Sequence, residues 1–195
     1  MNMRKTGVLM AALALAGGVQ ADEGKAHEQA AQAVAMGLMK ELGGALKKTM
    51  SAEGPAAAIR VCRDLAPRLT SRISREKGWR VTRVGTRVRN PLLGTPDAWE
   101  QQVLDRFAKR AAAGEPLGKL SFSAVVEEPN GRYFRYMKAI GVKPLCLTCH
   151  GSAEQIPAEV KAVLEAEYPH DRATGYRPGD LRGAFSIKWP LDAGS

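Results

Sequence analysis

Residues 120–140 have the sequence LSFSAVVEEPNGRYFRYMKAI, in which the pair Asn130-Gly131 separates two runs rich in β-branched and aromatic residues. Before this pair, apolar and polar side chains alternate from Leu120 to Glu127, as expected for a strand with one buried face. Asn-Gly is the strongest short-range signal for a two-residue hairpin turn. The stretch therefore predicts an antiparallel hairpin whose return strand covers Arg132 to Ile140.

The rest of the chain supplies helices on both sides of this hairpin in the sequence. Apolar residues with helical period, and proline, aspartate and glycine at the expected ends, predict helices over residues 27–50, 55–66, 97–113 and from 157 onward. Pro67 should kink or end the second helix near Ala66. Alternating patterns predict strands over residues 79–88, with Gly85 as a bulge, and 181–189. Because strands and helices do not alternate regularly, we expect an α+β fold with an antiparallel sheet and an N-terminal helical segment.

Length and composition limit the class of protein. The chain has 195 residues, of which 45% are hydrophobic and 25% are charged, with only three cysteines. These values argue against a disordered tail and against a small domain held together by disulfides. We expect one domain over residues 22–195.

The first 21 residues have the pattern of a secretory signal. Arg4 and Lys5 precede an apolar run over residues 7–19, and Val19-Gln20-Ala21 places small residues where a signal peptidase cuts. The run is too short to span a membrane. We therefore predict cleavage after Ala21, a periplasmic location and no spanning segment in the mature chain. An exported protein does not meet nucleic acid, so its net charge of about +7 (27 basic and 20 acidic residues after Ala21) favours acidic proteins, anionic lipids or anionic ligands as partners.

The residues Cys146-Leu147-Thr148-Cys149-His150 form the C-x-x-C-H signature of c-type haem attachment. Two thiols at this spacing reach the two vinyl groups of one porphyrin and form thioethers with them. The adjacent imidazole then binds the iron. We predict one covalently attached haem c, with His150 as an axial ligand through Nε2 and with its other ring nitrogen hydrogen-bonded to a carbonyl or water.

Three other interpretations of the two cysteines are weaker. A zinc site lacks a second C-x-x-C pair, and only His27 and His170 remain as nitrogen ligands. A thioredoxin-type redox pair lacks a surrounding βαβ pattern. A plain disulfide does not require the histidine that follows.

The second axial ligand is open from spacing alone. Cys62 lies on the apolar face of the second predicted helix, and a free thiol is most often a small buried hydrophobe. A lone thiol in an oxidising compartment nevertheless risks pairing with the haem cysteines, so its presence is easier to explain if it binds iron. The rival ligands are Met36, Met39, Met50, Met137, His27 and His170.

The chain resembles the single-domain, PAS-like c-type haem proteins, a family first described as a domain of unknown function and related to extracytoplasmic haem sensor domains. The resembling segments are residues 58–62 with Ala66-Pro67, 87–91, 96–100, 133–140, 146–151, 168–169, 174–176, 179–180 and 183–186. The resemblance implies a PAS-like antiparallel sheet flanked by helices, and it places the two axial ligands on His150 and Cys62. His170 departs from the family pattern, where a different residue is expected; we expect it to be a solvated loop residue.

These features favour a redox or ligand sensor or an electron carrier over an enzyme. Two axial protein ligands leave no open position on the iron, and an anionic sulfur ligand gives a low reduction potential. The alternative is a haem enzyme of peroxidase type, which needs a vacant distal position and acid–base groups such as His27, His170, Arg87 or Arg89. A low-spin, six-coordinate ferric spectrum would favour the first class.

A basic stretch runs from Arg68 to Arg89, where Glu76 is the only acidic residue. Its plainest interpretation is a solvated helix edge and strand face. If the strand over residues 79–88 is regular, Arg83, Arg87 and Arg89 share one face of it. Some of these side chains could then neutralise haem propionates, and the others could dock an acidic redox or signalling partner.

Overall fold

A computed structural model describes residues 14–192, with side chains described from Asp22 onward. The main helices are α1 (Ala14–Glu53), α2 (Pro55–Arg60), α3 (Ala66–Lys77), α5 (Ala98–Ala112) and α7 (Ala158–Glu167). Short helical segments are the π-helix η1 (Val61–Leu65), α4 (Pro91–Gly94), η2 (Leu117–Lys119), η3 (Pro144–Cys146) and α6 (Leu147–His150). The strands are β1 (Arg80–Gly85), β2 (Ser121–Glu128), β3 (Gly131–Gly141) and β4 (Leu181–Pro190).

The four strands form one antiparallel sheet in the order β1-β4-β3-β2. The predicted hairpin is confirmed: β2 pairs with β3 from Ser121 opposite Lys138 to Glu128 opposite Gly131. The last strand of the sequence, β4, lies between β1 and β3, so it carries hydrogen bonds along both edges. It thereby joins the N-terminal helical half of the chain to the hairpin.

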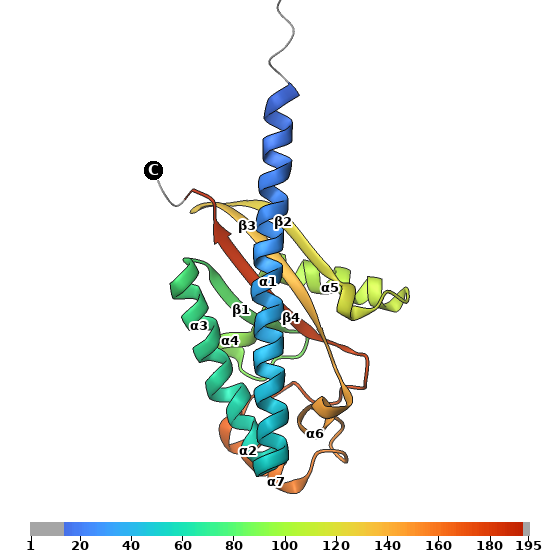
Figure 1. Cartoon of the computed structure of the whole chain (residues 1–195). Helices are drawn as coiled ribbons and strands as arrows, with labels where there is room; N and C mark the ends of the chain where they lie inside the picture. Colours follow the sequence, from blue (N-terminus) through green and yellow to red (C-terminus); the bar gives the residue numbers. More distant parts are fainter. Residues whose placement is uncertain (1–13, 193–195) are drawn as a thin grey trace, which may run out of the picture.

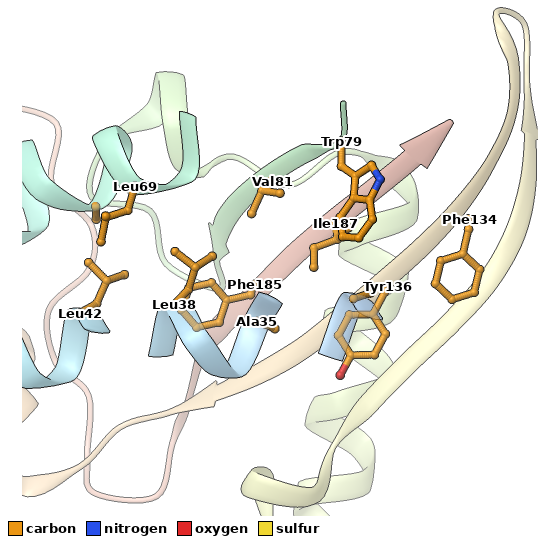
Figure 2. Close-up of a cluster of buried hydrophobic side chains, with 12 residues drawn as sticks. Ala35, Leu38, Leu42, Leu69, Trp79, Val81, Phe134, Tyr136, Phe185 and Ile187 are labelled. Carbon is orange, nitrogen blue, oxygen red and sulfur yellow. The ribbon is translucent and has the colours of Figure 1, made fainter. Parts of the chain in front are cut away.

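Helices cover both faces of this sheet, which confirms the predicted α+β class with its N-terminal helical segment. In Figure 1, α1 crosses the front of the sheet with α3 beside it, and α5 lies behind. The front core joins Leu38 and Leu42 of α1 to Phe185 and Ile187 of β4 (Figure 2). The rear core joins α5 to the opposite face of β3 and β4, and its buried members are Val84, Val103, Leu104, Phe107, Leu120, Met137, Ala139 and Ala184.

The first helix is longer than its apolar period predicts. The sequence indicates residues 27–50, whereas α1 runs from Ala14 to Glu53 and passes through Gly43-Gly44 without a break. Part of the predicted signal peptide, residues 1–13, lies outside the described residues. No helix within residues 14–192 combines the length and apolarity needed to cross a membrane.

The predicted break of the second helix near Ala66 takes the form of a change in helix type: the α-helix α2 ends at Arg60, and α-helix resumes only at Ala66. A regular α-helix would set the Pro67 ring against the carbonyl of Arg63. Instead the chain widens into the π-helix η1, in which the N–H of Ala66 donates to the carbonyl of Val61, five residues back. The wider turn accommodates the proline, and α3 continues with Pro67 in its first turn.

The first strand is shorter than predicted. It begins at Arg80 and ends at Gly85, which lies opposite Gly183 at the end of the β1–β4 ladder. Arg87 and Arg89 therefore follow the strand, and the expectation that they share a strand face with Arg83 is wrong. Gly85 ends the ladder rather than forming a bulge within it.

A network of buried charges that sequence patterns do not reveal lies beneath the start of α5. Glu100 and Arg135 are almost completely buried, and Glu100 accepts a hydrogen bond of 2.6 Å from the hydroxyl of Ser186. Burial alone would raise the pKa of Asp97, but hydrogen bonds from Arg135 and the Glu100 backbone outweigh it and lower that pKa. Asp97 also completes the predicted N-cap of α5.

Replacing Gly183 by alanine should destabilise the protein strongly. Its φ of +152° is rare for other residues, and a Cβ there would lie 2.0 Å from the carbonyl oxygen of Val84. We expect Gly183→Ala to lower the free energy of unfolding by about 2–4 kcal/mol in urea denaturation. Gly44→Ala is the matched control: because Gly44 lies inside α1 with open space around it, the added methyl group should stabilise by about 0.5–1 kcal/mol. Equal stabilities of the Gly183→Ala variant and the parent would contradict this packing.

Candidate haem-binding site

The C-x-x-C-H motif occupies a turn at the lower end of the sheet in Figure 1, where α6 lies beside α2 and α7. Cys146 is the last residue of η3, and Cys149 follows within α6, so the two thiols are about one helical turn apart. Cys146 packs against the cluster of Val142, Ala173 and Tyr176, and Cys149 packs against the apolar residues of α2 and α7. Both side chains are half-buried and both thiols are free.

The imidazole of His150 is held in one orientation by the backbone. Its Nδ1 lies 2.6 Å from the carbonyl oxygen of Ala173 and, since a carbonyl can only accept, Nδ1 carries the proton. The predicted hydrogen bond is therefore present, and Nε2 keeps its lone pair for a metal. Burial holds the pKa of His150 well below its usual value, and the charges of Arg89, Arg182 and Arg83 lower it further. The ring is thus neutral, the form that binds iron.

A loop from Asp171 to Tyr176 runs alongside the motif and fixes it. The amide of Gly175 donates to the carbonyl of Gly151 at 2.6 Å, and the amide of Tyr176 donates to the carbonyl of His150 at 2.9 Å. The Tyr176 ring then meets the His150 ring edge-on, with their centroids 6.1 Å apart. The loop therefore holds both the backbone and the side chain of the candidate ligand.

Arg89 connects this loop to the motif. Its Nη2 donates to the carbonyl of Cys149 at 2.5 Å, and its Nε donates to Asp171 at 2.9 Å. The same carboxylate accepts the amide of Ala173 at 2.7 Å. The side chains of Arg89 and Asp171 are only 9% and 11% exposed, so this ion pair is largely withdrawn from water. Its effect is to position the carbonyl that orients His150.

Cys62 lies on η1, which follows α2 directly. Its thiol is half-buried and close enough to Cys149 that a charge on it contributes to raising the pKa of the Cys149 thiol. Burial is the main cause of that shift, and the pKa of Cys149 reaches about 11. Next to Cys62, Arg63 pairs with Asp64 and with Glu167 at the end of α7. The structure thus brings Cys62 to the same end of the molecule as Cys146, Cys149 and His150.

The rival ligands lie in the cores, at the far end of β4 or at the surface, except Met50, which lies near the end of α1, the helix that contacts α2. Met39 packs into the front core and Met137 is fully buried in the rear core. His27, which near the predicted mature N-terminus we would expect to be solvated, is half-buried, and its ring lies 4.3 Å from that of Trp189 at the far end of β4. His170 is exposed, as expected of a solvated loop residue. Met36 is 44% exposed on α1, and Met50 is half-buried near its end.

The side chains present suit a tethered porphyrin. Two free thiols adjoin an imidazole whose Nε2 is unprotonated, and a third thiol lies on the neighbouring helix. Within residues 14–192, no group of three or more histidine, cysteine, aspartate or glutamate side chains gathers around a common point. The donor set therefore fits haem better than it fits a zinc ion held only by protein ligands.

Sequence patterns do not reveal the residues that support His150. Asp171 and Arg182 occupy a polar loop and the start of a strand, with no motif around them. Ala173 acts through its backbone carbonyl, and because every residue has one, the sequence cannot single out this carbonyl. Tyr176 and Arg89 belong to segments that resemble the haem family, and this resemblance is the signal that the sequence offers for them.

Removing Arg89 should cost more stability than removing a surface arginine. In Arg89→Gln the buried carboxylate of Asp171 loses its cation, and we expect a loss of about 3–5 kcal/mol in chemical denaturation of the purified full-length protein. Because Arg89→Gln with Asp171→Asn removes both charges, the double variant should lose clearly less than the sum of the two single losses. The matched control is the more solvent-accessible pair Arg110–Glu115, whose coupling should be much smaller because water screens it. Additive losses at Arg89 and Asp171 would refute the coupling.

Comparison with known proteins agrees with the fold and with the candidate haem-binding site. The model of the Tll0287-like family, described as Tll0287, matches residues 18–190. Among solved structures, the chain is similar to the crystal structure of the cyanobacterial heme-protein Tll0287, with 26% sequence identity and a TM-score of 0.62. That similarity covers 82% of this chain and 94% of the cyanobacterial one. No curated protein matches.

The family model spans every element from the first turns of α1 to the last residue of β4, including Cys62 and the whole C-x-x-C-H motif. The match is therefore to the complete arrangement of sheet, helices and motif loop. The chain belongs to the Tll0287-like family.

Proposed function

We propose that this protein binds one haem c through thioethers to Cys146 and Cys149, with His150 and Cys62 as axial ligands. In this proposal it acts in the periplasm as an electron carrier or a redox or ligand sensor. The single observation that carries the proposal is the hydrogen bond from His150 Nδ1 to Ala173, because it leaves Nε2 available beside two free thiols. The description of its structural relative as a heme-protein supports it.

The chain's own residues prepare the site before any cofactor arrives. The turn from η3 into α6 presents Cys146 and Cys149 together, while Arg89 and the 171–176 loop hold the backbone of the motif in place. Haem supplies one-electron chemistry when bound. Covalent attachment would keep it from being lost in the periplasm.

Cys62 sets the expected electronic character of the site. A thiolate stabilises ferric over ferrous iron, whereas methionine raises the potential. We therefore expect the reduction potential to be low.

If His150 and Cys62 both bind the iron, no coordination position is left for a substrate, and this favours electron transfer or sensing over catalysis. The peroxidase alternative needs acid–base side chains beside an open position. Of its candidates, His27 packs on Trp189 and His170 points into solvent. Arg89 is engaged by Asp171, and Arg87 donates to the carbonyl of Thr174. No contact among the described residues specifically favours that alternative.

Periplasmic export after cleavage at Ala21 would expose the basic surface to redox or signalling partners. Arg68, Arg72 and Arg75 lie exposed on α3, which continues directly from the π-helix that carries Cys62. Arg72 has only long contacts to Glu41 and Glu76, of 3.7 and 3.8 Å. The charge on this face is therefore largely uncompensated and suits an acidic partner.

Changing Cys62 tests the axial ligand directly. In the haem-loaded protein we expect a low-spin, six-coordinate ferric spectrum. Cys62→Ser should convert it to a high-spin form because serine is a poor iron ligand, and Cys62→Met should raise the reduction potential. Absorbance spectra and redox titration measure both changes.

The rival Met50 provides a matched control, since it is half-buried on a neighbouring helix. Met50→Leu should leave the spectrum and the potential unchanged. If both Cys62 variants keep the parent ferric spectrum, Cys62 is not a ligand. If Met50→Leu alone alters the spectrum, Met50 is the ligand instead.

The basic face of α3 should attract anionic redox probes. Oxidation of the reduced protein by hexacyanoferrate(III), an anion, should slow as ionic strength rises, whereas oxidation by hexaammineruthenium(III), a cation, should accelerate. Stopped-flow absorbance measures both rates.

Replacing Arg68 and Arg75 with glutamine should reduce this salt dependence. The matched control removes two exposed cations from α5 on the other face of the sheet, Arg106 and Lys109. Docking at α3 is excluded if the two double variants show the same salt dependence.

A further inference from the structure

Two arginine side chains from separate parts of the chain converge on one aromatic ring beside His150. Arg87 follows β1, and Arg182 is the second residue of β4. Their guanidinium carbons lie 4.2 and 5.4 Å from the centroid of the Tyr176 ring. This is the same ring that meets His150 edge-on. Two cations therefore flank the residue that packs against the candidate axial ligand.

The backbone leaves room for both side chains by means of glycines. A Cβ on Gly85 would lie 2.7 Å from Nη1 of Arg182, and a Cβ on Gly175 would lie 3.1 Å from Nη1 of Arg87. Gly175 also has a φ of +72°, which other residues rarely adopt. Side chains at either position would displace a guanidinium, so this arrangement depends on the local fold.

Hydrogen bonds to carbonyls hold the two guanidinium groups in place without neutralising them. Nη1 of Arg182 donates to the carbonyl of Arg87 at 3.0 Å, and Nη1 of Arg87 donates to the carbonyl of Thr174 at 2.5 Å. The phenol of Tyr176 is itself fixed between the amide of Arg87, at 3.0 Å, and the hydroxyl of Thr86, at 2.9 Å. The cluster is thus ordered by neutral groups.

The positive charge at this place lacks a matching carboxylate. Among the ion pairs of residues 22–192, Arg89 has Asp171, but neither Arg83, Arg87 nor Arg182 has an acidic partner. Burial lowers the pKa of Arg182, and the charges of Arg89 and Arg83 lower it further, which shows how closely these cations gather. Arg83 and Arg182 are half-buried and Arg87 is exposed. Cations that gather without an acidic partner favour the binding of an anion.

We infer that Arg87 and Arg182 bind a carboxylate, and that this carboxylate is a propionate of the haem. The inference rests on the proposed function, because a haem tethered at Cys146 and Cys149 brings two propionates to the neighbourhood of His150. A planar guanidinium matches a carboxylate with two parallel hydrogen bonds. Arg83 adds positive potential from β1.

Bound in this way, the propionate stays ionised over the physiological pH range. The potential of the haem is then almost independent of pH between about 5 and 8. Without one arginine, the pKa of the propionate rises because its anion loses a partner. The propionate would then titrate in this range, and protonating it removes a negative charge that stabilises the oxidised iron more than the reduced iron. The potential should therefore rise as the pH falls.

The experiment compares haem-loaded Arg182→Gln, Arg87→Gln and Arg182→Lys with the parent protein. Resonance Raman spectroscopy follows the propionate bending band, and redox titration follows the potential from about pH 5 to 8. Both glutamine variants should shift the band and make the potential pH-dependent. Arg182→Lys should keep the potential independent of pH, because it keeps the positive charge. It should still shift the band, because lysine lacks the planar guanidinium that makes two parallel hydrogen bonds.

Arg106→Gln is the matched control. Arg106 also lies over an aromatic ring, 4.0 Å from the centroid of Phe122, but on α5. It should leave both readouts unchanged. If Arg182→Gln does not fold or load haem, Arg87→Gln decides the question, since Arg87 is exposed and its loss should be tolerated.

Failure of this inference is distinguishable from failure of the proposed function. A parent protein that carries no covalent haem refutes the proposed function. A haem-loaded parent whose band and pH profile match those of both glutamine variants overturns the propionate assignment alone. A parent whose potential shifts saturably with added inorganic phosphate, and loses that response in Arg182→Gln, would also overturn it, because the arginines would then hold a free anion.

Discussion

The hydrogen bond from His150 Nδ1 to the carbonyl of Ala173 is the interaction on which the rest of the site depends. It selects the tautomer that leaves Nε2 free, and it fixes the direction in which that nitrogen points. Ala173 can serve in this way only because its own position is determined. Its amide is bound by Asp171, and Asp171 is bound by Arg89.

The residues that make these contacts come from distant parts of the sequence, and the fold brings them together. Arg89 follows β1, the motif follows β3, and the 171–176 loop precedes β4. Because β4 lies between β1 and β3, the segments that flank these strands meet at one end of the sheet. The close approach of Gly85 and Gly183 ends the β1–β4 ladder there and lets the Arg182 side chain turn toward Tyr176.

The π-helix η1 carries Cys62 at the same end of the molecule as the motif. The same widened turn accommodates Pro67 and offsets the helix by one residue relative to a regular α-helix. Arg63, which pairs with Glu167, connects that turn to α7. A local irregularity that sequence rules treat as a helix breaker thus carries the thiol that we propose as a ligand.

Much of the fold follows from local patterns, and much of the site does not. Asn130-Gly131 predicts the hairpin and Asp97 predicts the start of α5, since both act through neighbours in the sequence. The end of β1 at Gly85 depends on Gly183, almost a hundred residues later, so local alternation places it wrongly. The C-x-x-C-H motif identifies Cys146, Cys149 and His150 as candidate site residues. The roles of Asp171, the Ala173 carbonyl and Arg182 arise only from tertiary contacts, and no pattern in their own segments indicates them.

The most direct test of the central claim is the intact mass of the denatured protein purified from the periplasm of a haem-competent bacterial host. The account predicts the mass of residues 22–195 plus one haem, because thioether bonds survive denaturation. A colourless protein with the mass of the bare polypeptide would contradict it.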